Sequence, residues 1–380
     1  MNLNEFQEPI TVWPDFYSTR LEPKPCDWYN PTKAPFKMAG LAFFEKDGEY
    51  FRYPKNPPEP LPNGVVANGL GASGAQIRFS AETSRVCIRL KLNNPASPHP
   101  TANTSALLAG GVDLYASYGD GKYVMCGISN FDATVPAYEA TLLDMSQPKK
   151  LDFIINLPVR NKIQNVYIGL APGAKLIEPP AFKTDKRIVI YGGSIMQGYC
   201  ASRPGMTMPN ILARRLNQEV INLGVSGSGK CERETALSVA LVERPAILIM
   251  SPEGNCPTPE FITEHMTEFI ETYRQSHPTV PIAIMGYMKT SKEEIDENAR
   301  ASRLAKKAAM MAIVEYFRSR GDQNIYYWNG EEFTEGENDI VFEGHSAGLE
   351  CTADTDHKSD LGFFLMANGM IRKLRELGMA

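Results

Sequence analysis

A serine stands directly after a short run of β-branched and aromatic residues, where that run ends in two glycines. Residues 188–191 read Ile-Val-Ile-Tyr, and Gly192, Gly193 and Ser194 follow. The run is typical of a buried strand, and glycines allow backbone angles that a side chain would forbid. Ligand sites of open α/β sheets lie at the C-terminal ends of the strands. We therefore interpret Ser194 as a nucleophile exposed at the end of a strand.

The segment around Ser194 is compatible with two other structures when it is taken alone. Residues 192–198, Gly-Gly-Ser-Ile-Met-Gln-Gly, could form a phosphate-binding loop or an ordinary turn between a strand and a helix. A P-loop carries Lys followed by Ser or Thr, and a dinucleotide loop has the order Gly-x-Gly-x-x-Gly. Residues 192–198 have neither pattern. The phosphate-binding interpretation is therefore the weaker one.

An activated serine needs a base and an acid that orients the base. His357 lies in Asp-Thr-Asp-His, with Asp354 three residues before it. At this spacing the carboxylate can fold back onto Nδ1, which sets the tautomer while Nε2 faces Ser194. Asp356 is an alternative partner for the ring. The cluster could also be only the N-cap of the last helix, with Ser359 as the cap, and the two roles are compatible.

The other histidines are weaker candidates for the base. One lies in a proline-rich loop of the N-terminal half, two lie in or at the end of a polar helix, and one shares the loop of His357. The first three are expected to be solvated or capping residues. These histidines are His99, His265, His277 and His345.

Two further turns leave the same edge of the expected sheet and carry residues that could bind an oxyanion. Gly224 follows the apolar run 219–223, and the absence of a side chain would let its amide face a ligand. Asn255 follows the run 246–250 and could donate its side-chain amide. Each turn alone could be purely structural. Four strand ends that supply Ser, Gly, Asn and Asp-x-x-His in this order are much less expected by chance.

The residues after 178 alternate apolar strands with amphipathic helices. Residues 178–185, which are polar and rich in proline, are a plausible linker. Such alternation is typical of a parallel sheet covered on both faces. We therefore predict a three-layer, doubly wound α/β domain over residues 179–380. Its expected strands are 188–191, 219–223, 246–250, 281–285 and 324–328, and its expected helices are about 206–217, 231–243, 258–276, 291–319 and 360–377.

Residues 1–178 have the pattern of an all-β domain. Residues 1 to about 60 are rich in proline and aromatic residues, which disfavours long helices. Alternating segments follow, with Asp-Gly at 120–121 as a hairpin signal and residues 81–84 as a turn. Many short strands at regular spacing predict a jelly-roll-like β-sandwich over residues 1–178. The expected strands are 76–80, 85–92, 110–116, 122–126, 151–157 and 165–170.

Residues 186–380 resemble the SGNH (GDSL-like) hydrolase superfamily, named for a Ser, a Gly, an Asn and a His in four sequence blocks. The matching residues are Ser194, Gly224, Asn255 and His357. Gly-Val-Asp-Leu-Tyr at 111–115 is similar to the Gly-x-Asp-Leu-Tyr signature of a module that precedes such domains in one bacterial branch. Two positions depart from that branch, which often has Asp and Pro there, and the second departure could shift the histidine loop. They are Ser251 and Lys358.

The resemblance implies a hydrolase of carboxylic esters that works through an acyl-enzyme. In that scheme Ser194 is the nucleophile, His357 is the base and Asp354 is the orienting acid. The amides of Ser194 and Gly224, with the side chain of Asn255, bind the oxyanion. Neither a metal ion nor an organic cofactor is implied.

The expected substrate is an acetylated sugar, because a β-sandwich beside such a domain is similar to the layout of carbohydrate esterases. A lipase acting on longer acyl esters and a non-catalytic glycan-binding protein are the alternatives. Aromatic residues of the N-terminal domain could stack on sugar rings, but packing within the protein is the favoured interpretation for them. The aromatic residues considered are Trp13, Tyr17, Trp28 and Tyr29.

The composition argues against several classes of protein. The formal net charge of −5 gives no basic footprint for nucleic acid, and no apolar run approaches the roughly 20 residues that span a bilayer. The N-terminus carries acids without an apolar signal segment, and the seven cysteines form no Cys-x-x-Cys pair. We expect a cytoplasmic protein acting on a small-molecule or glycan ester, although an exported chain that had lost its signal would look the same. The oligomeric state is open.

Overall fold

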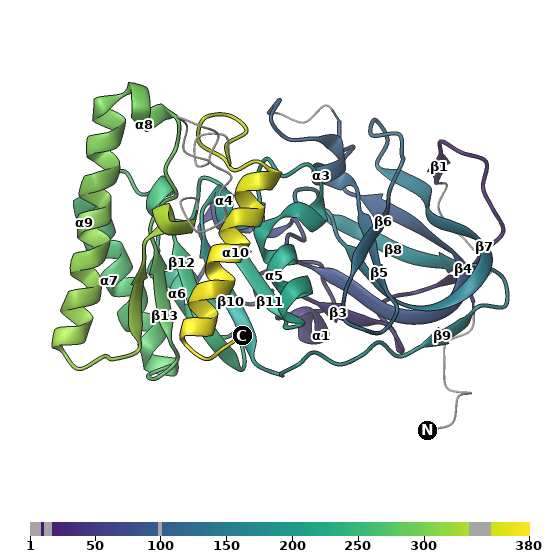
Figure 1. The fold of residues 1–380 in the computed structure, drawn as a ribbon, viewed down its shortest axis with the longest axis horizontal. Helices are drawn as coiled ribbons and strands as arrows, with labels where there is room; N and C mark the ends of the chain where they lie inside the picture. The colour runs from purple at the N-terminus through teal and green to yellow at the C-terminus, as the bar shows by residue number, and fades with distance from the viewer. Residues whose placement is uncertain (1–8, 11–16, 98–100, 334–350) are drawn as a thin grey trace.

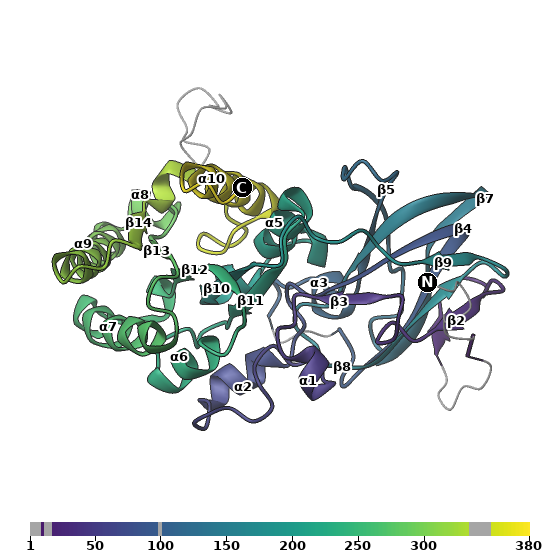
Figure 2. The ribbon, with the colours of Figure 1, turned by 90° about the horizontal axis from the view of Figure 1, so that it is seen from below.

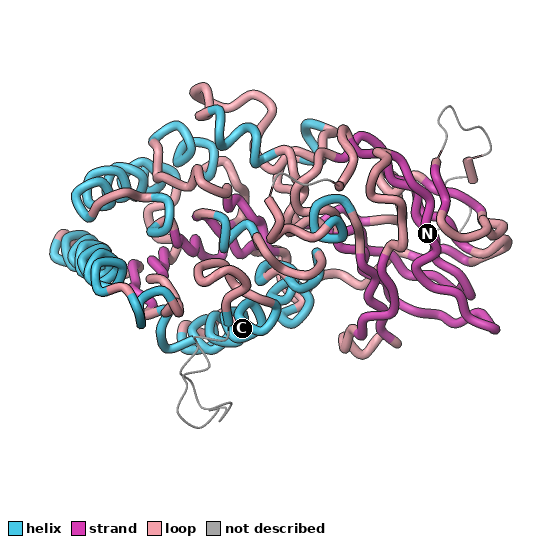
Figure 3. The backbone as a smooth tube through the Cα atoms, turned by 90° about the horizontal axis from the view of Figure 1, so that it is seen from above, coloured by secondary structure: helices cyan, strands magenta, loops and turns pink. Residues whose placement is uncertain are grey.

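The computed structural model describes residues 9–10, 17–97, 101–333 and 351–380. They form an antiparallel β domain followed by an α/β domain with a parallel sheet, which confirms the predicted fold class (Figure 1). Strands gather in the N-terminal half and helices surround the C-terminal half (Figure 3). The candidates His99, His345 and Trp13 lie outside the described residues. In the described part of the chain, no helix combines the length and the apolar character needed to cross a membrane.

The N-terminal domain is built on two long strands that pair with each other. Strand β4 (Gln76–Leu92) runs antiparallel to β7 (Ala137–Asn156) along most of its length. The predicted turn at residues 81–84 is wrong, because this segment continues β4 and pairs with both β7 and β9. A register shift between Thr83 and Arg85 marks a bulge there, and such bulges bend a strand without ending it.

The other strands of this domain add to the two long ones. The hairpin signal at 120–121 is confirmed, since β5 and β6 pair antiparallel around it. The described N-terminal sheet has nine strands. The remaining strands are β1 (Ser18–Thr19), β2 (Asp27–Tyr29), β3 (Lys37–Ala39), β5 (Asp113–Ser117), β6 (Val124–Ile128), β8 (Ile163–Leu170) and β9 (Lys175–Ile177), and the short helices are α1 (Phe44–Asp47), α2 (Asn63–Gly69) and α3 (Ala106–Gly110).

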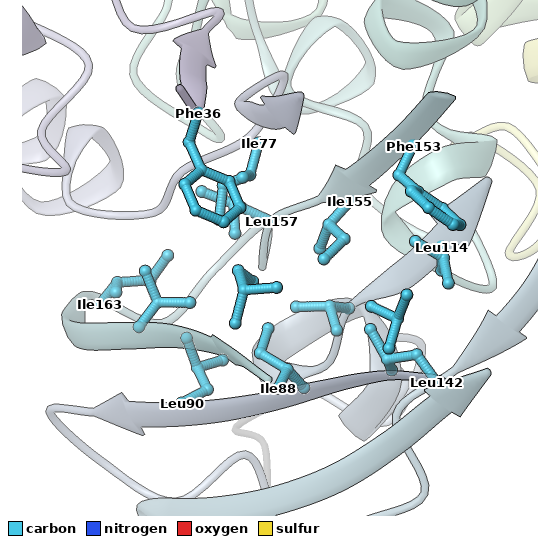
Figure 4. Packing of buried hydrophobic residues seen from close by; sticks show 14 of the residues in the cluster. Phe36, Ile77, Ile88, Leu90, Leu114, Leu142, Phe153, Ile155, Leu157 and Ile163 are labelled. Atoms are coloured by element: carbon cyan, nitrogen blue, oxygen red, sulfur yellow. The ribbon is translucent and has the colours of Figure 1, made fainter. Parts of the chain in front are cut away.

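The bent sheet encloses an apolar core between its two halves. Ile77 comes from the first half of β4 and Ile88 from the second, and both belong to one buried cluster (Figure 4). Phe79 stacks on Phe153 with ring centroids 5.0 Å apart. Alternate residues of a strand point to opposite faces, so the alternating pattern of β4 places one set of side chains in this core.

The C-terminal domain has a parallel five-stranded sheet in the order β11-β10-β12-β13-β14. Every predicted strand of this domain is present, with ends that differ by a residue or two. Strand β10 lies beside the centre of the sheet, and its neighbours β11 and β12 carry the two other turns predicted to serve Ser194. The strands are β10 (Arg187–Gly192), β11 (Val220–Gly224), β12 (Pro245–Ser251), β13 (Ile282–Met285) and β14 (Ile325–Trp328).

Helices cover both faces of this sheet, as Figure 2 shows. Helices α5 (Met208–Leu216) and α10 (Asp360–Glu376) pack on one face. Helices α6 (Arg233–Val239), α7 (Pro259–Ser276) and α9 (Glu297–Ser319) pack on the other. The shorter helical segments are α4 (Ser194–Gln197), α8 (Lys292–Ile295), η1 (Pro204–Met206), η2 (Glu253–Asn255) and η3 (Gly330–Phe333).

The N-terminal chain shares the core of the α/β domain. Tyr53 and Val65 are fully buried in the cluster on the α6–α7 face of the parallel sheet. The hydroxyl of Tyr53 donates to the carbonyl of Leu223 at 2.6 Å. The guanidinium of Arg52 is also buried and donates to main-chain carbonyls on both sides of the interface, including that of Asn222. The two domains are therefore packed as one body.

The Gly-x-Asp-Leu-Tyr segment forms a second contact between the domains. Asp113 is fully buried, and its Oδ2 accepts from Arg203 Nη1 and from the amide of Gly205, each at 2.7 Å. Its Oδ1 accepts from Asn156 Nδ2, and the Tyr115 hydroxyl accepts from Arg203. A buried carboxylate needs such partners to offset its desolvation. The signature therefore docks the β domain onto the loop that follows α4.

Candidate active site

Ser194 lies where the sequence places it, at the C-terminal end of β10. The backbone of Gly192 has φ +154, and a Cβ there would come within 2.4 Å of the Ser251 carbonyl oxygen, so no larger residue fits. Gly193 precedes the short helix α4, in which Ser194 is the first residue, and Gly198 ends that helix with φ +94. The tight turn leaves the Ser194 side chain partly exposed at the sheet edge.

A continuous chain of hydrogen bonds joins Ser194, His357 and Asp354. Ser194 Oγ lies 2.8 Å from His357 Nε2, and His357 Nδ1 lies 2.8 Å from Asp354 Oδ2. The main-chain amide of His357 donates to Asp354 Oδ1, also at 2.8 Å. Burial raises the pKa of Asp354, but the hydrogen bonds from His357 outweigh it and the pKa is lowered overall. Asp354 is thus held as a carboxylate against the imidazole ring.

The alternatives for the base and the acid are placed elsewhere. Asp356 accepts a hydrogen bond of 2.9 Å from the Tyr287 hydroxyl rather than from the imidazole. His277 caps the end of α7, and its Nε2 lies 2.8 Å from the carbonyl of Ala240, as expected for a capping residue. His265 stacks on Phe261 within α7. The predicted N-cap is present too, since Ser359 accepts from the amide of Gly362.

Lys358 does not displace the histidine loop, although proline was expected there from the resemblance. Its side chain is completely buried, and Nζ lies 3.4 Å from the carbonyl oxygens of Met288 and Lys289. Burial lowers the pKa of Lys358 to about 8. The lysine therefore fastens the loop to the segment after β13, while His357 still reaches Ser194.

Asn255 reaches the site from η2, directly after β12. Its Oδ1 accepts from the amide of Gly229 at 3.0 Å, which leaves Nδ2 as the free end of the side chain. A Cβ at Gly193 would come within 2.6 Å of Asn255 Oδ1, so glycine is required for this close approach. Asn255 lines the same cavity as Ser194 and His357.

Gly224 does not reach the site, and the prediction that its amide binds an oxyanion is wrong. It is the last residue of β11, it is buried, and its amide donates to Asn222 Oδ1 at 3.0 Å. Gly227, three residues later, lines the cavity and has φ +68. Strand β11 continues one residue further than expected, so that Gly224 still belongs to the strand. The signal that distinguishes Gly227 is its left-handed backbone.

Three hydrogen-bond donors around the cavity have no acceptor within the described part of the chain. They are the amides of Ser194 and Gly227 and the Nδ2 of Asn255. All three residues line the cavity that contains Ser194 Oγ and His357 Nε2, which has a volume of about 280 Å³. Unpaired donors beside a nucleophile are suited to bind an oxygen that becomes negative as the nucleophile attacks.

The turn that carries Gly227 is held by the N-terminal domain. The amide of Ser226 donates to Gln197 Oε1 at 2.8 Å, and Asn68 Nδ2 donates to the Ser226 carbonyl at 3.0 Å. Arg160 donates to both Asn68 Oδ1 and Gln197 Oε1. These polar residues lie far from the turn in sequence, and no local pattern identified them.

Among the described residues, Cys200, Asp354 and His357 lie close enough together to offer ligand atoms to a metal ion. The same atoms already form hydrogen bonds with one another, at 3.8 Å between Cys200 Sγ and Asp354 Oδ2 and at 2.8 Å between Asp354 Oδ2 and His357 Nδ1. Burial raises the pKa of Cys200 to about 12, so the group is a neutral thiol at neutral pH. These hydrogen bonds fit the orienting acid and the base of an activated serine better than a metal site.

Two family models match the chain in sequence. The model of the GDSL-like lipase/acylhydrolase family matches residues 185–375, which are half of the chain. The chain belongs to this family. A model described as the N-terminus of SGNH-hydrolase-type esterases matches residues 26–176. This GDSL-like acylhydrolase is therefore an ester hydrolase that carries a Gly-x-Asp-Leu-Tyr module. None of the curated proteins compared with the sequence matches it significantly.

Solved structures of similar fold cover nearly the whole chain of this GDSL-like acylhydrolase. A protein described as a GDSL-like lipase from Bacteroides ovatus has a TM-score of 0.81 at 26% identity, covering 92% of this chain and 97% of its own. The salicylyl-acyltransferase SsfX3 of a tetracycline biosynthetic pathway has a TM-score of 0.70 at 17% identity, with the same coverage. A family two carbohydrate esterase from Clostridium thermocellum, solved with cellohexaose, has a TM-score of 0.55 at 14% identity, covering 81% of this chain and 94% of its own.

Proposed function

We propose that the protein is a serine esterase that removes short acyl groups, above all acetyl, from carbohydrates. The observation that carries this proposal is the hydrogen-bonded chain Ser194–His357–Asp354 beside unpaired donors. The family supports ester hydrolysis in general, and the shape and polarity of the cavities around Ser194 support the substrate class.

The catalytic cycle follows from the positions of the side chains. His357 Nε2 accepts the proton of Ser194 Oγ as Oγ attacks the ester carbonyl carbon, and Asp354 stabilises the imidazolium that forms. The oxyanion binds the amides of Ser194 and Gly227 and the Nδ2 of Asn255, and one such donor contributes about 3–4 kcal/mol. The tetrahedral intermediate collapses, and His357 returns the proton to the alcohol that leaves.

Deacylation repeats these steps with water in place of the serine. His357 removes a proton from a water molecule, whose oxygen attacks the acyl carbonyl on Ser194. The same donors bind the second oxyanion. When this intermediate collapses, Ser194 Oγ leaves and takes the proton back from His357, so that the acid is released and the enzyme is restored.

The lining of the cavity around Ser194 suits an ester with a short acyl chain. Most of the described residues that line it are small or polar, and Ile195 is the only aliphatic side chain larger than alanine among those described residues. The volume of about 280 Å³ is shared between the acyl group and the start of the alcohol. A long acyl chain would need an extended apolar wall to offset the loss of water contacts. Acetyl esters fit this lining better than lipid esters.

The surface next to this cavity suits an alcohol that is rich in hydroxyls. A second cavity of about 290 Å³ shares Gly254, Tyr287 and Asp356 with the first. Its lining includes the ammonium groups of Lys292 and Lys306, which have no ion-pair partner among the residues that the structure describes. Carboxylates and hydroxyls complete the wall. Because a sugar hydroxyl both donates and accepts, a wall that mixes fixed donors with acceptors suits it.

The aromatic residues of the N-terminal domain do not contribute to this argument. Tyr17, Trp28 and Tyr29 are buried, and Arg89 packs over the Trp28 ring at 4.1 Å from its centroid. The interpretation that they serve packing is confirmed for these three residues. Support for a sugar substrate comes instead from the polar second cavity and from the carbohydrate esterases of similar fold.

The proposal is tested by hydrolysis assays on the intact protein. Wild type should release p-nitrophenol from p-nitrophenyl acetate and acetate from acetylated xylo-oligosaccharides, and the rate on p-nitrophenyl esters should fall from acetyl to octanoyl. Ser194→Ala should lack all turnover while keeping the thermal unfolding temperature of wild type. A rate that rises towards octanoyl would make the protein a lipase, and activity retained in Ser194→Ala would overturn the assignment of the nucleophile.

A further inference from the structure

One loop of the N-terminal domain contacts the acid of the active site. Asn103 lies in the connection between β4 and α3, and its Nδ2 donates a hydrogen bond to Asp354 Oδ2. The same oxygen accepts from His357 Nδ1 at 2.8 Å. The partners are separated by 251 positions in sequence. The carboxylate is therefore shared between its own loop and a residue of the other domain.

The orientation of the Asn103 amide is set by a second contact. The Tyr199 hydroxyl donates to Asn103 Oδ1 at 3.0 Å. That hydroxyl also bonds to Thr101 Oγ1, and because its one hydrogen is used on Asn103, the threonine must be the donor. The carbonyl end of the amide thus faces Tyr199, and the NH₂ end faces Asp354. No other orientation of the amide satisfies both partners.

The carboxylate of Asp354 is held at both oxygens. Oδ1 accepts from the main-chain amides of His357 and Asp356, and Oδ2 accepts from His357 Nδ1 and Asn103. Besides the Cys200 thiol, whose Sγ lies 3.8 Å from Oδ2, the one contact from outside the 354–357 loop among the described residues is the hydrogen bond from Asn103. Without it, the carboxylate could turn about its Cβ–Cγ bond or bind water, and both changes weaken its hold on the imidazole. Tyr199 adds to the restraint, since its ring packs on that of His357 with centroids 4.7 Å apart.

We propose that Asn103 is a positioning residue for the Asp354–His357 pair, so that the N-terminal domain completes the active site of the enzyme. This inference rests on the proposed esterase function. A charge-assisted hydrogen bond to a carboxylate is among the stronger kinds, and it keeps Asp354 both ionised and aimed at Nδ1. The β domain then affects turnover even of small esters, although none of its described residues lines the cavity that contains Ser194.

The test compares two substitutions in the same connection of the full-length protein. Asn103→Leu keeps the volume but removes the donor, whereas Asn94→Leu changes an exposed asparagine whose side chain makes no hydrogen bond to the described residues. With p-nitrophenyl acetate we expect Asn103→Leu to lower kcat about tenfold to a hundredfold with KM nearly unchanged, as for a small misplacement of a catalytic group. Asn94→Leu should match wild type.

A spectroscopic readout separates positioning from a general loss of fold. The proton shared by His357 Nδ1 and Asp354 should give a low-field ¹H NMR signal in wild type and in Asn94→Leu, and it should broaden or vanish in Asn103→Leu. Tyr199→Phe, which frees the amide to turn, should give a smaller fall in kcat. The Tyr199→Phe variant also tests the inference if Asn103→Leu does not fold.

The outcomes distinguish this inference from the function on which it rests. If wild type hydrolyses acetyl esters through Ser194 but Asn103→Leu keeps both its kcat and the low-field signal, the positioning role is overturned and the esterase stands. If wild type hydrolyses no ester and Ser194 is inert, the proposed function falls and this inference falls with it.

Discussion

The guanidinium of Arg52 donates a hydrogen bond of 2.7 Å to the carbonyl oxygen of Gly224, 172 positions later in the chain. The same side chain donates to the carbonyls of Asn68, Gly71 and Asn222, and it is completely buried, with no carboxylate partner among the described residues. Burial lowers the pKa of Arg52 to about 10, so it stays charged at neutral pH. The end of β11 is therefore tied to the N-terminal domain just before the turn that carries Gly227.

Arg52→Met should destabilise the whole protein. The substitution leaves several buried carbonyls without donors, and we expect a loss of about 3–5 kcal/mol in the free energy of unfolding. Urea unfolding followed by circular dichroism measures this loss. Arg244→Met is the control, because Arg244 forms an exposed ion pair with Asp185, and it should cost less than about 1 kcal/mol. Equal stabilities of the two variants would contradict the role given to Arg52.

Asn255→Asp should impair the chemical step while leaving the turn in place. The aspartate keeps an oxygen for the amide of Gly229, but it replaces the free Nδ2 donor by an acceptor. Loss of one oxyanion donor typically costs about a hundredfold to a thousandfold in kcat, and we expect at least that loss here with p-nitrophenyl acetate. Gly224→Ala is no suitable control, because a Cβ there would come within 2.6 Å of the amide nitrogen of Gln197. A kcat within about threefold of wild type would exclude Asn255 as a donor.

Lys306→Met should weaken the binding of sugar esters and leave the hydrolysis of small esters unchanged. Lys306 lines the second cavity and not the first, so p-nitrophenyl acetate should be hydrolysed as by wild type. Loss of a hydrogen bond from a charged donor predicts a rise of about tenfold in KM for acetylated xylo-oligosaccharides. The exposed Lys150→Met on β7 serves as the control. Unchanged KM values for both substrates would show that the sugar does not enter this cavity.

Because of Glu253, the free energy of unfolding should depend on pH in the range below pH 7. Burial raises the pKa of Glu253 to about 7, whereas the unfolded chain has a value of about 4.3. The folded protein thus binds more protons between these values, and this contribution to stability is present at low pH and lost as pH rises through 7. Glu253→Gln keeps an acceptor for the Tyr287 amide and removes the titration.

The unfolding temperature of Glu253→Gln should therefore be higher than that of wild type, and the difference should be largest at pH 8. The difference should shrink steadily towards pH 5. The exposed Glu264→Gln on α7 should show a difference that does not vary with pH in this range. A constant difference for Glu253→Gln as well would show that Glu253 does not titrate in this window.

Local patterns in the sequence predict the α/β domain well. An apolar run that ends in glycine predicts β10 and the position of Ser194. An aspartate three residues before a histidine predicts the Asp354–His357 contact. Both features depend on residues that are neighbours in the chain. The predicted helices of this domain are all present, although the expected helix at 291–319 divides into α8 and α9 at Asp296, which caps α9.

Contacts between distant residues could not be predicted in this way. Asn103 and Arg52 lie in loops or turns of the β domain, and Asn68 lies in the short helix α2; polar residues are ordinary at such positions and no periodicity marks them. Their importance comes only from the packing of the two domains. Residues 81–84 look like a turn, yet they pair with β7 and continue β4, since strand pairing over long distances outweighs local preference. The apolar pattern ends at Leu223, whereas β11 extends to Gly224, so the pattern does not show that the glycine facing the cavity is Gly227.

The reactivity of Ser194 tests the central claim most directly. A fluorophosphonate reacts only with a serine that a neighbouring base activates, so the intact protein should be labelled once, and mass spectrometry of its peptides should place the label on Ser194. His357→Ala should abolish labelling, whereas Asp356→Asn should keep it. A wild-type protein that stays unlabelled, or that carries the label on another residue, would contradict the account.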